Sequence, residues 1–291
     1  MKCNLCPRKC NVDRDISLGA CKMSNTMRVA KIMVHSWEEP PISGTYGSGA
    51  IFFSGCNLGC VHCQNRDISH GGYGKDMTVD ELCHEILELQ KKGVHNINLV
   101  TPTHFSHKII EALDKVKSEL KIPVVYNTSG YELPCEIEKL RGYVDIFLTD
   151  IKYFSSEASK KYSSAESYYE NAILAFGKML EMTGKCDFDE NGIMRRGVIL
   201  RHLVLPSLRH DSIKILKDVS EKYNVDDFKL SLMCQYTPDF CPDAHKELKR
   251  KITTFEYTSV VDVARQLGYD GYIQDISSAS AIYTPEFIEK E

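Results

Sequence analysis

A long apolar run is missing from this sequence. None of its 291 residues falls in an uninterrupted apolar stretch of about eighteen, the length that a membrane-spanning helix needs. The first residues, Met1 to Pro7, also lack the apolar core of a secretory signal. We therefore expect a cytoplasmic protein that does not bind a membrane.

An excess of positive charge is missing as well. Lysine and arginine total 36 against 40 aspartate and glutamate residues, so the net charge is −4. Nucleic acids and anionic membranes attract clustered positive charge, and we expect neither as a partner. With 43% hydrophobic residues, the chain can build an ordinary core. Its length fits one large domain with an appendage, or two modest domains.

Cysteine, by contrast, is abundant. There are twelve cysteines, and seven of them lie within the first 63 residues. In a reducing cytosol, such a surplus indicates metal ligation rather than disulfide bonds. The other five are scattered, and we expect at least Cys83, Cys135 and Cys186 to be small buried apolar residues.

Three cysteines form the most informative motif. Cys56, Cys60 and Cys63 have the spacing C-x3-C-x2-C, directly after the apolar run 49–55. Three thiolates on one loop can hold three corners of a 4Fe-4S cluster and leave the fourth iron open to a small molecule. The alternatives are three structural thiols, or a zinc site that takes a ligand from elsewhere. Zinc sites usually contain paired C-x2-C elements, and this loop has one such pair.

This motif resembles that of the radical S-adenosylmethionine (SAM) superfamily. The resemblance implies that the 4Fe-4S cluster follows the first barrel strand and binds SAM at its open iron. We therefore take Cys56, Cys60 and Cys63 as both metal ligands and catalytic residues.

A second cysteine motif lies at the N-terminus. Cys3, Cys6, Cys10 and Cys21 have the spacing C-x2-C-x3-C-x10-C. Four thiols with one C-x2-C pair suit tetrahedral zinc or a second, fully ligated 4Fe-4S cluster. The alternative is a set of free structural thiols. We expect residues 1–45 to form a cysteine-rich metal-binding extension, and residues 46–291 to form the main domain.

Beyond Gly49, apolar strand-like runs alternate with helical patterns. A capping box, Thr78 with Glu81, predicts the start of the first helix, and Gly93 predicts its end. Hydrophobic strands that alternate with helices form parallel sheets covered by helices. Six or seven such units predict an α/β fold, a partial, open parallel β/α barrel rather than a closed barrel of eight units. We expect its later strands near residues 97–101, 124–127, 145–151, 197–205, 228–235 and 271–275.

Polar residues follow the carboxyl ends of the expected strands, where functional groups gather in such folds. SAM carries a carboxylate, and Lys152 and Arg201 are the natural cations for it, since arginine can hold a carboxylate through two hydrogen bonds. Taken singly, a strand-end aspartate is often a turn former, and a strand arginine is often a surface charge. As an ordered set, one for each strand end, these residues indicate a cofactor site. We assign to cofactor binding Asn65, Thr101, Thr103, Asn127, Ser129, Asp150, Lys152, Arg201 and Gln235.

A narrower resemblance covers nearly the whole chain. The sequence resembles the pyruvate formate-lyase activating enzyme group, especially a branch with an N-terminal four-cysteine motif. The resemblance implies that Asp150 contacts the SAM ribose or helps to form a monovalent-cation site, and that Lys152 and Arg201 hold the methionine carboxylate. It also implies that Asn65 lies near the adenine, and that His62 takes the place of an aromatic residue that packs on the adenine. The stretches that carry it are 35–40, 53–56, 63–65, 98–104, 126–131, 150–152, 201–206 and 235–238.

The chain also departs from that group. Its activators have Gly-Gly-Glu after the second strand, to grip the methionine amino group, where this chain has Pro102 to His104. An aspartate of the cation site is replaced by Asn127, which removes one negative charge. Only the residues from Gln64 to Met77 separate the cysteine motif from the first helix, which leaves no room for a ferredoxin-like module there.

The function that we expect is that of a radical SAM oxidoreductase. A flavodoxin or ferredoxin-type donor reduces the cluster, SAM is cleaved to a 5′-deoxyadenosyl radical, and this radical abstracts hydrogen. The resemblance favours a glycine of a partner glycyl radical enzyme as the target. The alternatives are another peptide or a small molecule, or a non-catalytic iron–sulfur electron carrier or redox sensor. A carrier needs no SAM pocket, so Asp150, Lys152 and Arg201 argue against it.

The single tryptophan, Trp37, precedes Glu38 and Glu39. One interpretation is a packing anchor beside solvated carboxylates. The other places the glutamates over the mouth of the active site, where they contact substrate.

Overall fold

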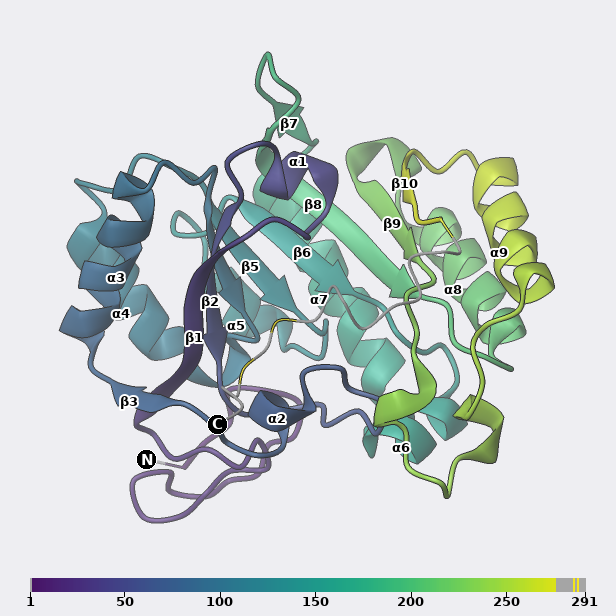
Figure 1. Cartoon of the computed structure of the whole chain (residues 1–291), viewed down its shortest axis with the longest axis horizontal. Coiled ribbons are helices and arrows are strands. Elements are labelled where there is room, and N and C mark those ends of the chain that lie inside the picture. Colours follow the sequence, from purple (N-terminus) through teal and green to yellow (C-terminus); the bar gives the residue numbers. More distant parts are fainter. Residues whose placement is uncertain (1, 276–284, 286, 288–291) are drawn as a thin grey trace.

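The computed structural model describes residues 2–275, 285 and 287. Within them, the chain forms one curved, open sheet (Figure 1). Seven neighbouring strands of this sheet pair in parallel. The prediction of a partial parallel barrel of six or seven units is therefore confirmed. The parallel strands, in spatial order, are β2 (Ser48–Phe53), β4 (Ile97–Val100), β5 (Val124–Thr128), β6 (Ile146–Asp150), β8 (Met194–Leu203), β9 (Lys229–Met233) and β10 (Gly271–Ile273).

Antiparallel strands extend the sheet beyond β2. β1 (Met27–His35) pairs with β2, and β3 (Lys75–Met77) pairs with β1. β1 lies within residues 1–45, for which the sequence predicts little regular structure, because most of its side chains are half-buried and give no clear alternation. The cysteine-rich segment that precedes the sheet is therefore residues 2–26. The end of the predicted main domain, residues 276–284, 286 and 288–291, lies outside the described residues.

Helices pack around the outside of the sheet (Figure 1). The predicted capping box is present at α3, where the Thr78 side chain accepts from the Glu81 backbone and Glu81 binds back to Thr78. No described helix is long and apolar enough to cross a membrane. The long helices are α3 (Val79–Lys91), α4 (Ser106–Val116), α6 (Ser156–Ser163), α7 (Tyr168–Thr183), α8 (Arg209–Lys222) and α9 (Thr254–Gln266). Shorter elements are α1 (Pro40–Ser43), α2 (Arg66–Ser69), α5 (Pro134–Glu138), β7 (Asp187–Phe188, on β8), η1 (Thr103–Phe105), η2 (Val225–Asp227), η3 (Pro238–Phe240) and η4 (Lys246–Leu248).

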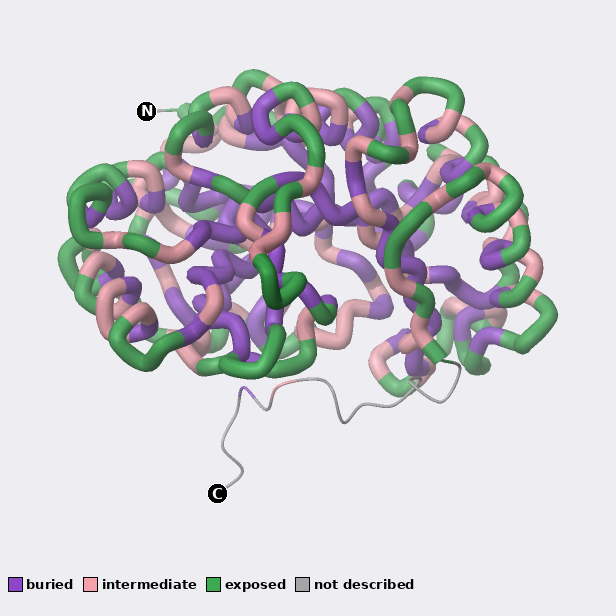
Figure 2. The backbone as a smooth tube through the Cα atoms, turned by 90° about the horizontal axis from the view of Figure 1, so that it is seen from above, coloured by how far each residue is buried: buried purple, intermediate pink, exposed green. Residues whose placement is uncertain are grey.

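The core between the sheet and the helices fixes the strand ends. Buried residues run through the middle of the molecule, and exposed residues cover its outer surface (Figure 2). Leu82, Ile86 and Leu89 of α3 are fully buried in this core, as their spacing predicts. Tyr168 of α7 is also fully buried, and its hydroxyl donates to the carbonyl of Ser129 at 2.7 Å. A helix thereby anchors the loop that follows β5.

Candidate functional site

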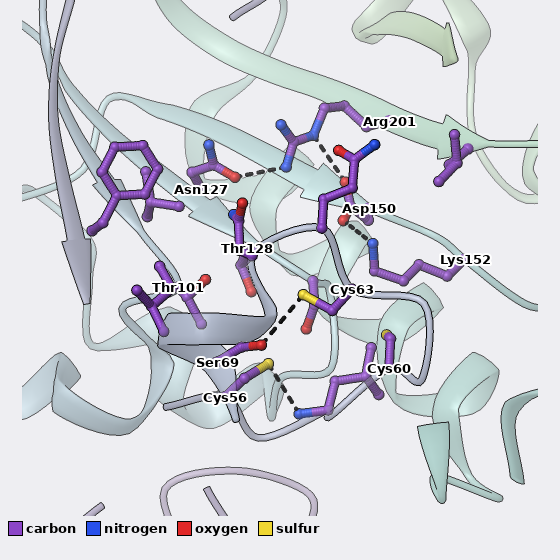
Figure 3. Close-up of a pocket in the computed structure, with 18 of the residues that line it drawn as sticks. Cys56, Cys60, Cys63, Ser69, Thr101, Asn127, Thr128, Asp150, Lys152 and Arg201 are labelled. Atoms are coloured by element: carbon purple, nitrogen blue, oxygen red, sulfur yellow. Dashed lines mark hydrogen bonds and ion pairs between the residues drawn. The ribbon is translucent and has the colours of Figure 1, made fainter. Parts of the chain in front are cut away.

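The loop after β2 brings the three cysteines of the central motif together. Cys56, Cys60 and Cys63 line one cavity of about 250 Å³ (Figure 3). The loop turns at Gly55, whose φ is +82°, a conformation that favours glycine. A Cβ at Gly55 would also lie 2.7 Å from the carbonyl oxygen of Cys21. The turn that exposes the motif therefore also packs on the N-terminal segment.

Each of the three sulfurs lies near a hydrogen-bond donor. The Leu58 N–H lies 3.4 Å from Cys56 Sγ, and Ser69 Oγ lies 3.3 Å from Cys63 Sγ (Figure 3). Ser163, at the end of α6, donates to Cys60 Sγ at 3.1 Å. Hydrogen bonds to sulfur tune the potential of an iron–sulfur cluster. The donor set and its convergence on one cavity therefore fit a 4Fe-4S cluster.

A charged group lies across the cavity from the cysteines, at the ends of β6 and β8. Asp150 accepts from Arg201 Nε at 2.8 Å and from Lys152 Nζ (Figure 3). Arg201 Nη2 also donates to Asn127 Oδ1 at 2.6 Å. Burial opposes ionisation of Asp150, but the two cations outweigh it and lower the pKa of this carboxyl. Asp150 is therefore a buried carboxylate with a cation on each oxygen.

Glu38 is a second buried carboxylate of this group. It lies in the loop after β1 and accepts from Asn98 at 3.0 Å, from Asn127 at 3.2 Å and from Arg201 at 3.4 Å. Burial raises the pKa of Glu38, and Arg201 opposes that rise. Glu38 lines the cavity beside Trp37, whose exposed fraction is 65%. The interpretation that places the glutamates after Trp37 at the mouth of the active site therefore agrees with the position of Glu38.

Most of the other predicted cofactor residues also line the cavity. His62 is buried edge-on to Tyr236, with the ring centroids 5.9 Å apart. Burial lowers the pKa of His62 to about 3, which keeps the ring neutral. Thr101 has a φ of +59°, a strained conformation for a β-branched residue. The cavity-lining residues predicted for the cofactor are His62, Asn65, Thr101, Asn127, Ser129, Asp150, Lys152, Arg201 and Gln235.

Thr103 is the exception. It is not among the described residues that line the cavity, because its hydroxyl donates to Glu132 Oε1 at 2.5 Å. The backbone turn at Thr101 leads into η1, which directs Thr103 into this buried contact. Thr128 donates to the same oxygen of Glu132 at 2.5 Å. The Thr103 hydroxyl therefore holds the loops after β4 and β5 together instead of facing a ligand.

The N-terminal cysteines lie outside the cavity, in the segment that packs beside α2 and β3 (Figure 1). The sulfurs of Cys10 and Cys21 lie 3.6 and 3.3 Å from the point that a Cβ on Gly19 would occupy. Burial raises the pKa of Cys21, and the neighbouring Cys3 and Cys10 add to the rise. In the part of the chain that the structure describes, no three His, Cys, Asp or Glu side chains are placed to hold a single ion. Metal binding by the four cysteines stays a prediction.

Comparison with known proteins indicates the family. Residues 50–188, which contain the central cysteine motif and run from within β2 to the end of β7, match the model of the radical SAM superfamily. Over these residues, the chain is similar to the radical SAM superfamily. This similarity implies a 4Fe-4S cluster and SAM as cofactors, in agreement with the donor set of Cys56, Cys60 and Cys63.

Two relatives and two solved structures are also similar to this chain. It is 27% identical to the uncharacterized protein MJ0674 of Methanocaldococcus jannaschii, over 92% of this chain and 75% of that one. It is 25% identical to the pyruvate formate-lyase-activating enzyme of Clostridium pasteurianum, over 57% of this chain and 66% of that one. A radical SAM methyltransferase from Sphaerobacter thermophilus shares the fold, with a TM-score of 0.52, 12% identity, and coverage of 80% and 69%. SuiB of Streptococcus suis bound to S-adenosylmethionine has a TM-score of 0.50 and 13% identity, over 76% of this chain and 48% of SuiB.

Sequence reasoning missed Ser69 and Ser163, which donate to the sulfurs of Cys63 and Cys60. One interpretation placed Glu38 at the mouth of the site, but its contact with Arg201 was not predicted. The signal that could have identified Ser69 is its closeness to the motif in the sequence. It lies in α2, which follows the motif directly and turns back on the loop. Ser163 has no local signal, since it lies 103 residues from Cys60.

Proposed function

We propose that this radical SAM enzyme cleaves SAM reductively and abstracts hydrogen from a glycine of a partner glycyl radical enzyme. One observation carries the proposal: the three motif cysteines and the charged group around Asp150 line the same cavity of about 250 Å³. The similarity to the activating enzyme of Clostridium pasteurianum supports the choice of target. When bound, the cluster and SAM supply the one-electron chemistry that generates a 5′-deoxyadenosyl radical. The electron donor is a flavodoxin or a ferredoxin-type protein.

Arg201 and Lys152 orient the carboxylate of SAM in this proposal. Arg201 uses three of its five N–H groups on Asp150, Asn127 and Glu38, which leaves two for a ligand. The Asp150 carboxylate keeps both cations in place and charged, because it raises the pKa of Lys152 against the effect of burial. The guanidinium joins Asn127 and Asp150 directly, so these two residues need no inorganic cation between them.

His62 forms part of the wall of the adenine side. Its ring is neutral, and it packs edge-on to Tyr153 and Tyr236. His62 lines the cavity and offers ring surface to a flat heterocycle, while the two tyrosines pack against it and hold the ring in place. The backbone groups at the strained Thr101 lie on the same cavity and are our candidates for binding the amino group of SAM.

Anaerobic assay of cysteine variants tests the proposal. Serine at Cys56, Cys60 or Cys63 removes a cluster ligand, and we expect formation of 5′-deoxyadenosine to stop. The matched control is Cys135→Ser, which we expect to retain the wild-type rate. Cys135 is exposed on α5, so the expectation that it is a buried apolar residue is wrong. Wild-type formation of 5′-deoxyadenosine by any of the three variants would show that the motif does not carry the chemistry.

Two further measurements separate the alternatives. Adding SAM to the reduced protein changes the electron-spin resonance of a cluster with an open iron, whereas an electron carrier without a SAM site shows no change. Incubating the protein with SAM and a glycyl radical enzyme yields a glycyl radical signal if the target is correct. Cleavage of SAM without that signal favours another peptide or a small molecule. The Thr103 hydroxyl donates to Glu132, so it does not bind the amino group of SAM in the way that a Gly-Gly-Glu motif does.

A further inference from the structure

Arg8, in the N-terminal cysteine segment, binds two parts of the main domain at once. Its Nε donates to the carbonyl of Asn57 at 2.7 Å, and its Nη2 donates to that of Leu58 at 2.9 Å. The same guanidinium donates to the carbonyl of Ser163 at 2.8 Å and to that of Ser164. One side chain therefore joins the motif loop to the C-terminal end of α6, 155 residues away from Arg8.

Two of the residues that Arg8 holds also donate to sulfurs of the central motif. The Leu58 N–H lies 3.4 Å from Cys56 Sγ, and the Ser163 hydroxyl lies 3.1 Å from Cys60 Sγ. Arg8 binds the carbonyl of each of these two residues. It thereby fixes the backbone from which both donors project.

Arg8 is also flanked by two predicted metal ligands. Cys6 and Cys10 lie two residues before and after it. The backbone between them is a tight turn, in which Lys9 N–H donates to the carbonyl of Cys6 at 3.0 Å and Lys9 has a φ of +41°. This hydrogen-bonded turn fixes the origin of the Arg8 side chain.

The N-terminal segment has further contacts with the loop that do not need Arg8. Gly55 lies so close to Met23 and to the carbonyl of Cys21 that a Cβ could not be added. Arg14 donates to the carbonyl of His104 at 2.5 Å and is buried. We therefore expect an Arg8 variant to stay folded with its N-terminal segment docked.

We propose that Arg8 is a positioning residue for the active-site cluster. It ties the turn Cys6–Cys10 to Leu58 and Ser163, so that the N-terminal segment holds the donors to the active-site sulfurs in place. This inference rests on the proposed function, in that Cys56, Cys60 and Cys63 hold a cluster that binds SAM.

Redox titration of the full chain, loaded anaerobically with iron and sulfide, tests this role. The signal that changes on addition of SAM belongs to the active-site cluster, and its midpoint potential is the readout. Arg8→Ala removes four carbonyl contacts, so the sulfur donors move and we expect a more negative potential and about tenfold slower 5′-deoxyadenosine formation. Arg8→Lys keeps the charge but lacks the planar fork that spans both carbonyl pairs, and we expect partial rescue.

The matched control is Arg196→Ala. Arg196 likewise donates to two backbone carbonyls, those of Thr183 and Met182, at 2.8 and 2.9 Å, but it lies at the start of β8, away from the cavity. We expect its potential to equal that of the wild type. An Arg8→Ala protein with the wild-type potential and the wild-type response to SAM would overturn the positioning role.

If the wild type itself gives no response to SAM, the proposed function fails. In that case, the rate at which a chelator removes iron tests the role of Arg8. We expect faster loss of iron from Arg8→Ala than from Arg196→Ala. Equal rates would overturn the positioning role.

Discussion

Replacing Asp150 by asparagine should destabilise the protein strongly while keeping its shape. Asp150 accepts from Arg201 at 2.8 Å and from Lys152, and all three side chains are largely buried. Removing one partner of a buried ion pair leaves an uncompensated charge and costs about 3–5 kcal/mol. Arg201 keeps Glu38 as a partner in the variant. We therefore place the loss at the lower end, about 3 kcal/mol in the free energy of unfolding.

A double-mutant cycle isolates the ion pair. In Asp150→Asn/Lys152→Met, both charges of the pair are gone, and replacing a whole buried pair is often nearly neutral. We expect the double variant to be more stable than the sum of the single losses predicts, by about 2 kcal/mol. Anaerobic urea unfolding of the metal-free protein, followed by circular dichroism, measures these values, provided that the m-values stay equal.

The same reasoning fixes the pH dependence. Because the pKa of Asp150 is lowered in the folded state, its contribution to stability is present above the unfolded value of 3.8 and is lost as the pH falls through the lower folded value. The difference between wild type and Asp150→Asn should therefore shrink only below about pH 4. Two results would refute the reasoning. One is a double variant whose loss of unfolding free energy equals the sum of the two single losses within about 0.5 kcal/mol. The other is a stability difference between wild type and Asp150→Asn that vanishes near neutral pH.

Three further predictions concern stability. Burial raises the pKa of Glu132 from 4.5 to about 7, so its contribution is present below pH 4.5 and is lost as the pH rises through about 7. Between these pH values, the wild type should lose about 3 kcal/mol of unfolding free energy relative to Glu132→Gln. Parallel plots of stability against pH for the two proteins would contradict this. Thr101→Gly should raise the free energy of unfolding by about 1 kcal/mol, because glycine adopts a positive φ without strain. A lower free energy of unfolding would show that packing of the Thr101 side chain contributes more than the strain costs. Thr78→Ala should lower the free energy of unfolding by about 1 kcal/mol, since it removes the hydroxyl of the capping box, and an unchanged urea midpoint would argue against that role.

Features with a local pattern could be predicted from the sequence. The capping box of Thr78 and Glu81 lies where the sequence predicts it. The parallel strands also lie where the alternation of patterns places them, namely β2, β4, β5, β6, β8, β9 and β10. The cysteine motif predicted that one loop brings three thiols together, because the spacing of ligands on one loop is itself a geometric constraint. Asp150 and Arg201 followed from the rule that functional groups gather at strand ends, and the cavity brings them together.

Features that depend on distant contacts could not be predicted. Arg8 and Ser163 meet only when α6 docks beside the motif loop, and no local pattern marks either residue. Glu38 resembles a solvated carboxylate in the sequence, but the amides and guanidinium that surround it allow it to be buried. Thr103 has the right position along the chain, yet the strained backbone at Thr101 turns it toward Glu132.

Trp37 has a practical consequence. It is the only tryptophan of the chain, it lines the cavity, and it is largely exposed. All indole fluorescence of the protein therefore originates at the entrance to the site. Stopped-flow emission could time the arrival of each reactant there without any attached dye, and a peptide that quenches it could be ranked directly against others.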